Sequence, residues 1–247
     1  MSGVMLSEWT KLRTVRSTVW TMLGVVIVMI GFGYLNAAAA RGQADRHPMI
    51  DPALLTLGGA PVASLMVASL GVLAISGEYR TGMIRTTLLA VPRRMRMLAA
   101  KTAVFTVFSL TVSLLTCFAT FFVGQVVLGP YGTGLGEPGV LRIVGGCALY
   151  ITGSGVFGLA LGALVRHTAG GIVAVTVTLF LLPQLVGVIP GGTGARLMPY
   201  VTSVAGMRVM SPETAGGLAP WTGFGVFCLW IAVALAGAAY LLRRRDA

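Results

Sequence analysis

The sequence predicts an all-α membrane protein. It would be a single transmembrane domain over residues 1–247, with six transmembrane helices, an N-terminal amphipathic helix at the membrane interface and a short helix in one cytoplasmic connection. Apolar residues make up 56% of the chain and charged residues only 10%, whereas a soluble domain carries about 25% charge. Mean hydropathy is +0.88. Six stretches are long enough to cross the ~30 Å hydrocarbon core of a bilayer.

The N-terminal segment, residues 1–17, has its own pattern. Met5, Trp9, Leu12, Val15 and Val19 recur at helical spacing, and the charged residues point elsewhere. This pattern predicts an amphipathic helix that lies in the cytoplasmic interface, with its tryptophan at the level of the lipid headgroups. A cleaved signal peptide is the alternative, but the apolar stretch that follows is longer than the ~7–15 residues of a signal sequence.

The six expected spans contain no Asp, Glu, Lys or Arg. They cover roughly residues 18–40, 55–77, 102–128, 143–165, 169–189 and 221–242. Cytoplasmic loops are enriched in Lys and Arg, so the connections indicate the orientation. Thirteen of the 18 basic residues lie in the N-terminal segment, the second and fourth connections and the C-terminal tail. The pattern predicts a multi-pass protein with both termini in the cytoplasm and residues 190–220 on the outside.

Small and polar residues within the spans suggest how the helices meet. Ser154, Gly158 and Gly162 recur every four residues, which favours close packing against another helix. Pro183 followed by Gln184 predicts a kink in the fifth span. The amides of Asn36, Gln125 and Gln184 are candidates either for a surface that faces a ligand or for structural hydrogen bonds between helices, and the sequence leaves both interpretations open.

Several kinds of chemistry lack the residues that they need. Ion-coupled carriers usually hold an ionisable residue inside the membrane, and the six spans have none. The sequence has no P-loop, no G-x-S-x-G and no H-E-x-x-H. Its three cysteines are too far apart for a metal motif. We therefore expect no metal site and no enzymatic activity. The chain has a net charge of +11, and its basic residues lie in short segments between the apolar runs. This arrangement indicates membrane lipids rather than nucleic acid as partners.

The second connection, residues 78–101, has the most structured pattern of all. Gly82 permits a sharp change of direction, and apolar residues then recur at i, i+1, i+4, i+5 and i+8 until Pro92. The pattern predicts a two-turn amphipathic helix that offers an apolar face to a soluble partner. A simple basic topology anchor is the alternative. The residues assigned to this feature are Glu78, Arg80, Gly82, Met83, Ile84, Thr87, Leu88, Val91 and Pro92.

Two stretches resemble the membrane-spanning permease subunits of type-2 ABC exporters, in particular the small six-span kind common in actinobacteria. One is the N-terminal run Ser-Glu-Trp-Thr-Lys-Leu-Arg that starts at Ser7, and the other is Gly-Glu-Tyr-Arg-Thr-Gly from Gly77 through to Pro92-Arg93-Arg94. A weaker match is Leu197-Met198-Pro199-Tyr200. Family members often have Thr where this chain has Met83, so the chain departs from the family pattern at the start of the short helix.

The resemblance implies a role for each segment. Residues 2–16 would form an elbow helix, residues 82–92 a coupling helix that sits in a groove of an ATPase subunit, and residues 190–220 short helices that dip back into the outer leaflet. Glu78 would lie at a hinge beneath the second span. The ATPase would be a separate chain that binds ATP and Mg²⁺, so this chain would hold no cofactor. Two permeases would pair in the plasma membrane, as a homodimer or with a sister chain.

The implied function is ATP-driven export. Because the spans lack charge, the cavity would suit a hydrophobic or amphipathic cargo such as a lipid, a peptide or a drug. Two alternatives stay open at this point: a polytopic scaffold or sensor subunit that transports nothing, and an intramembrane enzyme.

Overall fold

The structure is a computed structural model, and it describes residues 6, 7, 9, 10, 14, 16–42, 51–80, 94–190, 192–211 and 217–244, without the side chains of 78–80, 94 and 243. Every regular element in these residues is helical. Six helices or helical runs are long and apolar enough to cross a membrane, which confirms the predicted all-α membrane fold. The expected coupling helix, residues 82–92, lies outside the described residues.

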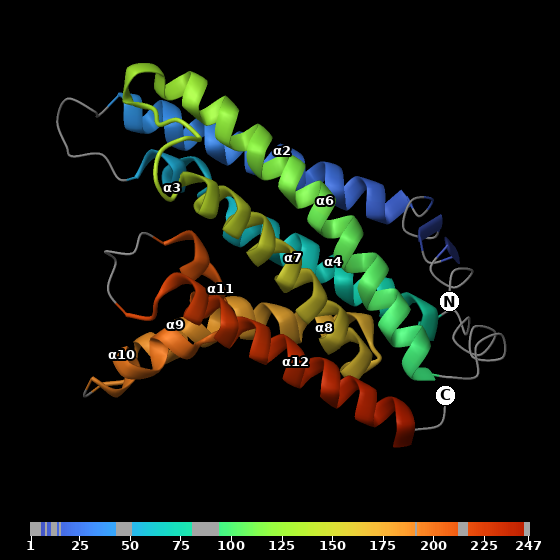
Figure 1. The fold of residues 1–247 in the computed structure, drawn as a ribbon. Helices are drawn as coiled ribbons and strands as arrows, with labels where there is room; N and C mark the ends of the chain where they lie inside the picture. The colour runs from blue at the N-terminus through green and yellow to red at the C-terminus, as the bar shows by residue number, and fades with distance from the viewer. Residues whose placement is uncertain are drawn as a thin grey trace.

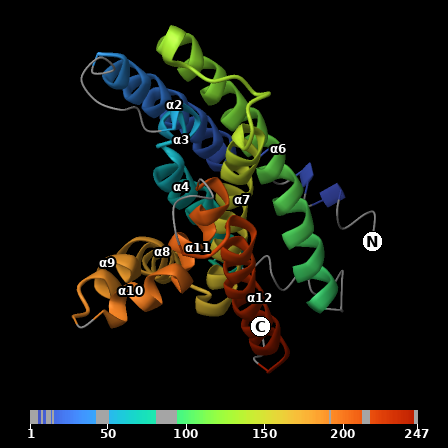
Figure 2. The same cartoon turned by 60° about the vertical axis from the view of Figure 1, so that its left-hand side comes forward.

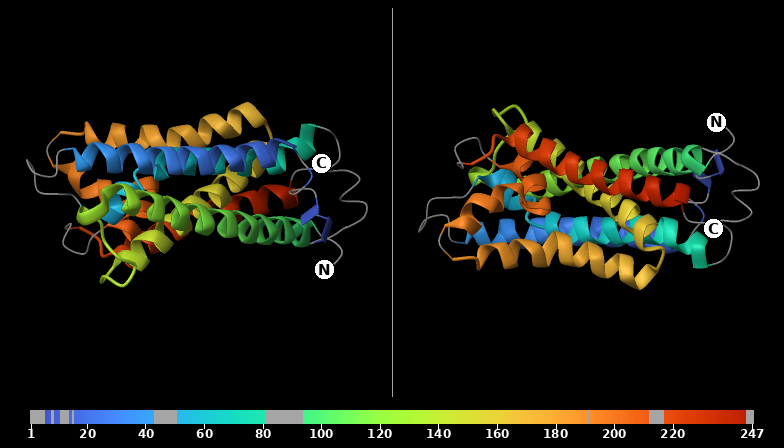
Figure 3. Two further views of the ribbon diagram at one scale, coloured as in Figure 1. Left: turned by 90° about the horizontal axis from the view of Figure 1, so that it is seen from above. Right: turned by 90° about the horizontal axis from the view of Figure 1, so that it is seen from below.

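The spans run back and forth along one common direction (Figure 1). They are α2 (Arg16–Arg41), α4 (Ala60–Arg80), α6 (Arg94–Leu128), α7 (Val140–Val165), the run from α8 (Thr168–Thr176) to α9 (Leu182–Gly187), and α12 (Pro220–Arg244). The start of α2, the end of α4, the start of α6 and the end of α12 lie together (Figure 3). We call this the basic end of the bundle, and the other the far end.

Two spans begin five or more residues away from the expected start, while the other bounds differ by at most three residues. The expected second span starts at residue 55, but a short helix, α3 (Pro52–Thr56), and a turn at Leu57–Gly59 come before α4. The side chain of Asp51 caps α3 by accepting from the amides of Ala53 and Leu54. Helix α6 begins at Arg94, eight residues before the expected start, because Arg and Lys are good helix formers and continue the helix beyond its apolar run.

Helix α7 is the centre of the bundle. Of its membrane window, 72% is buried inside the protein, the largest share among the six spans. It packs most extensively against α4, with α2 and α6 on one side and α8 and α12 on the other (Figure 2). Close approach is possible because glycines of each helix lie against the backbone of the other: a Cβ on Gly158 would overlap the Ala68 carbonyl, and one on Gly71 would overlap the Gly155 carbonyl.

The fifth span is interrupted in its middle. Between α8 and α9 lies a π-helical turn, Val177–Leu181, whose bonds include Leu182 N–H to the Val177 carbonyl. Pro183 follows at once and has no N–H to donate, so the π turn coincides with the place where an α-helical ladder would lose a bond. The interruption therefore lies one turn before the predicted Pro183–Gln184 kink.

Short helical segments cover the far end between the fifth and sixth spans. They are α10 (Thr193–Leu197), a 3₁₀ turn Met198–Tyr200, α11 (Thr202–Met207) and a second 3₁₀ turn, Arg208–Met210. α11 and the turn after it pack against α7 and α12. Trp230 of α12 fixes the first turn, because its indole N–H donates to the Tyr200 carbonyl at 3.0 Å.

Candidate functional site: the ends of α4 and α6 and the polar residues of the spans

The residues assigned to ATPase docking fall at the edge of the described structure. Gly82, Met83, Ile84, Thr87, Leu88, Val91 and Pro92 lie in residues 81–93, outside it. Glu78 and Arg80 belong to the last turn of α4, and only their backbone is described. Helix α4 ends at Arg80 and α6 begins at Arg94, both at the basic end. The connection between them is thus held by two long helices.

Hydrogen bonds tie the last turns of α4 to two other spans, α6 and α8. Lys101 of α6 is only 4% exposed, and its ammonium group donates to the Ala74 carbonyl at 3.5 Å. On another side of α4, the hydroxyls of Ser76 and Thr168 share a hydrogen bond of 2.9 Å. A displacement of the end of α4 would therefore strain the hydrogen bonds that join it to α6 and α8. From the sequence alone, Lys101 was only one of the basic residues of the second connection, residues 78–101.

Asn36 and Gln125 serve local structure at the far end. The Asn36 amide of α2 donates to the Leu55 carbonyl of α3 at 3.2 Å. The Gln125 side-chain oxygen accepts from the Thr133 amide at 2.7 Å and holds the segment after α6. Gln125 Nε2 is buried and has no hydrogen-bond partner within the described part of the chain. Of the two open interpretations, these contacts favour structural hydrogen bonding.

Gln184 has different surroundings. It is exposed on α9, in the span whose membrane window is only 17% buried. One side of this span packs inward through Gly171, Val175 and Leu179. The other side exposes large apolar side chains, namely Val173, Val177, Phe180, Leu181, Leu185 and Val188. We call this exposed surface, with Gln184, the α8–α9 face. An amide in hydrocarbon is costly without a partner, so the face is suited to contact another polar molecule.

The predicted small-residue stripe lies on α7, where its members have different neighbours. Gly158 and Gly162 lie against the backbone of Ala68 and Val72 of α4. Ser154 is buried and donates to the carbonyl of Tyr150 in its own helix. The adjacent Gly155 contacts α4 instead.

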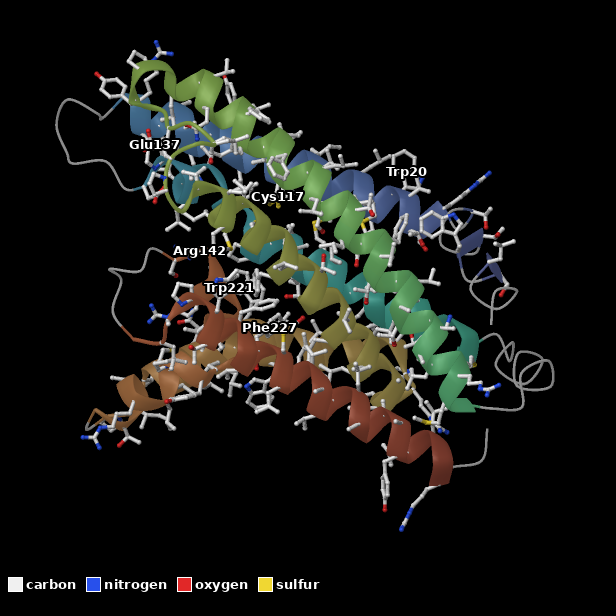
Figure 4. All side chains as sticks on the ribbon, viewed as in Figure 1. Trp20, Cys117, Glu137, Arg142, Trp221 and Phe227 are labelled. Carbon is white, nitrogen blue, oxygen red and sulfur yellow. The ribbon has the colours of Figure 1, made fainter. Side chains whose placement is uncertain are left out.

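Two further residues of α7 join it to other parts of the fold in a way that the sequence did not indicate: Tyr150 to two spans, and Arg142 to the segment between the fifth and sixth spans. Tyr150 is fully buried in α7, accepts from the Ser64 hydroxyl of α4 at 3.3 Å, and packs its ring 5.7 Å from Phe227 of α12. Arg142 at the start of α7 donates to the Val209 and Ser211 carbonyls, both at 2.9 Å (Figure 4). Among the described residues, no three His, Cys, Asp or Glu are grouped to hold a metal ion.

Comparison with known protein families decides the class. The family model described as ABC-2 family transporter protein matches residues 4–184, more than two thirds of the chain. The chain belongs to the ABC-2 transporter family. No curated protein matches the chain at significant similarity. The match starts in the N-terminal segment, includes the connection between α4 and α6, and ends at Gln184 of α9.

Membership of the ABC-2 family agrees with the spans. The protein is a multi-pass membrane protein and a transport permease subunit. The matched region holds the α4–α7 contact, the ties of Lys101 and Ser76, and the α8–α9 face up to Gln184.

Proposed function

We propose that this ABC-2 permease is the membrane-spanning subunit of an ATP-driven exporter. A separate ATPase chain supplies the energy by binding ATP and Mg²⁺ and docks on residues 82–92. The family match over residues 4–184 carries this proposal, since that region includes the α4–α6 connection. The permease lies in the plasma membrane with its basic end and both termini in the cytoplasm, where thirteen of the 18 basic residues would face the anionic leaflet.

The contacts at the basic end support a route from the ATPase to the spans. ATP binding moves the docked connection and, with it, the end of α4. Helix α4 cannot slide freely against α7, because the Gly158–Ala68 and Gly71–Gly155 contacts interlock the two backbones. The two helices move as a unit, and Lys101 and Ser76 draw α6 and α8 along. Directional transport follows if the cargo binds the two states with different affinity.

The α8–α9 face supports the pairing of two permeases. A second copy, or a sister permease, places its own amide against Gln184 and covers the apolar side chains around it. The cavity between the two subunits is apolar with a few amides and hydroxyls, which suits a hydrophobic or amphipathic cargo such as a lipid, a peptide or a drug.

The proposal is tested by affinity purification of the permease from mild-detergent extracts of its native host, with the co-purified chains identified by mass spectrometry. Leu88→Asp places a charge on the apolar side of the docking helix and should abolish the association and the permease-stimulated ATP hydrolysis. Gly136→Asp is the matched control, since it adds the same charge at the far end where no atom lies within 4 Å of a new Cβ. Equal recovery of the ATPase with both variants would overturn the assignment of residues 82–92 as the docking helix. An unmodified permease that recovers no ATPase would overturn the proposal that the protein is part of an exporter.

A further inference from the structure

An apolar groove lies at the basic end, between the N-terminal segment and α6. It has a volume of about 270 Å³ and is lined by Leu6, Trp9, Ala103, Val104 and Val107. The Trp9 ring meets Phe108 of α6 edge-to-face with 6.0 Å between the centroids, so one wall is fixed by an aromatic contact. The part of the N-terminal segment that the structure describes lies on the side of α6 that faces away from α7 (Figure 2). The groove is therefore on the outside of the bundle.

A continuous exposed strip of α6 leads from this groove towards the helix start. Arg96, Ala99, Ala103 and Val107 are all exposed and follow one another at intervals of three or four residues, which places them on one helix face. Arg96 lies seven residues before Ala103, about 10 Å along the axis at the helical rise per residue. Because Ala99 and Ala103 have small side chains, the surface of α6 between Arg96 and the groove is low. A cation at one end and an apolar groove at the other form a surface complementary to an anionic amphiphile.

We infer that this surface binds one anionic phospholipid, with an acyl chain in the groove and the phosphate at Arg96. The groove opens outward from a membrane span, so the molecule that reaches it is a lipid. Tryptophan is enriched at the membrane–water interface, and Trp9 in the groove wall places the groove next to that interface, with Arg96 about 10 Å further towards the helix start. Guanidinium binds phosphate through two parallel hydrogen bonds. The bound lipid links the N-terminal segment to α6, and the site does not depend on which ATPase or cargo the permease uses.

Bromine on an acyl chain quenches tryptophan fluorescence on contact, which gives a direct test on the full chain. Trp20→Phe, Trp221→Phe and Trp230→Phe leave Trp9 as the only fluorophore of the four tryptophans. The protein is placed in phosphatidylcholine nanodiscs that contain a small, fixed fraction of either brominated phosphatidylglycerol or brominated phosphatidylcholine. We expect the anionic lipid to quench Trp9 as though it were enriched about fivefold over the zwitterionic one, the effect of one basic residue at a membrane surface.

Arg96→Gln should lower this enrichment to well below that of the Arg244→Gln variant, although the other basic residues of the same end still attract anionic lipid. Ala103→Phe, which fills the groove, should lower quenching by both lipids. Arg244→Gln is the control, because Arg244 is exposed at the same end on α12 and far from the groove along the chain. Equal quenching by the two lipids in the protein with Arg96 would show ordinary boundary lipid and overturn the inference. So would an equal enrichment in Arg96→Gln and Arg244→Gln.

A second measurement covers the case in which the three Phe replacements prevent folding. The wild-type protein is extracted in mild detergent with phosphatidylglycerol and analysed by native mass spectrometry. We expect one retained phosphatidylglycerol per chain that Arg96→Gln loses and Arg244→Gln keeps. Retention of the same number of lipids by all three proteins would contradict the site.

Discussion

Gly158 of α7 and Ala68 of α4 are in direct backbone contact, with no room between them for a side-chain atom. A Cβ on Gly158 would overlap the Ala68 carbonyl oxygen and its carbon. The neighbouring Gly162 lies against the backbone of Val72 one turn further along the same helix. Without a hydrophobic driving force between helices in lipid, such close van der Waals packing is a main source of helix association.

Gly158→Ala should therefore destabilise the permease, by about 1–3 kcal/mol or more, because the added methyl group overpacks the α4–α7 contact. Gly145→Ala is the matched control in the same helix, since no atom lies within 4 Å of its new Cβ. That control should be neutral or stabilising by up to ~1 kcal/mol, as alanine favours helix more than glycine. The melting temperatures of the purified variants in detergent give the comparison. Equal melting of the two variants would contradict the assigned contact.

Arg142→Gln should loosen the far end of the bundle. The guanidinium donates to the Val209 and Ser211 carbonyls, and a hydrogen bond from a charged group contributes about 1.5–3 kcal/mol. We expect faster hydrogen exchange in the segment Thr202–Ser211 and a lower melting temperature. Arg196→Gln, at an exposed site of the same region, should change neither. If the exchange of this segment were the same in both variants, Arg142 would not hold it.

The spans could be predicted from the sequence because six charge-free apolar runs leave few alternatives. Their bounds could not. The helical stretch 94–101 carries charged residues that read as a loop, although Lys101 is in fact buried against α4. The π turn at Val177–Leu181 contains no charged residue or glycine from which it could be predicted. Only Pro183, which follows it, indicated an irregularity in this part of the span.

The sequence indicated which residues belong to the candidate site, but not which partners their side chains contact. Three amides stood out in the spans, but spacing alone could not tell that Asn36 and Gln125 bond to nearby backbone while Gln184 is exposed. In the α7 stripe, Ser154 bonds within its own helix and its neighbour Gly155 faces α4. Which residue of such a stripe meets a partner depends on the rotation of both helices, and that is a tertiary property. The role of residues 82–92 stays a prediction.

The proposed orientation can be tested with reporters at both ends of the bundle. A fluorescent or enzymatic reporter fused after Ala247 should read as cytoplasmic, and a reactive cysteine introduced at Gly136 of the far end should be labelled from outside intact cells. The excess of basic residues at the basic end is the physical reason. Native Cys228 is exposed and is first replaced by alanine, and the labelling is judged against that background. The opposite result at both positions would invert the orientation and, with it, the docking side.

Gln184→Cys should cross-link two permeases if the α8–α9 face is the surface on which they pair. Across a twofold contact the same residue meets its own copy, and two amides that bond to each other would be replaced by two thiols within reach of a disulfide. In the Cys228→Ala background, mild oxidation in native membranes should give a dimer band that reduction removes. Leu115→Cys is the control, since Leu115 is 69% exposed on α6 at membrane depth but away from this face. A dimer from both positions would indicate random collision. A dimer from neither would show that Gln184 faces lipid or cargo, and the pairing surface would have to be sought on another span.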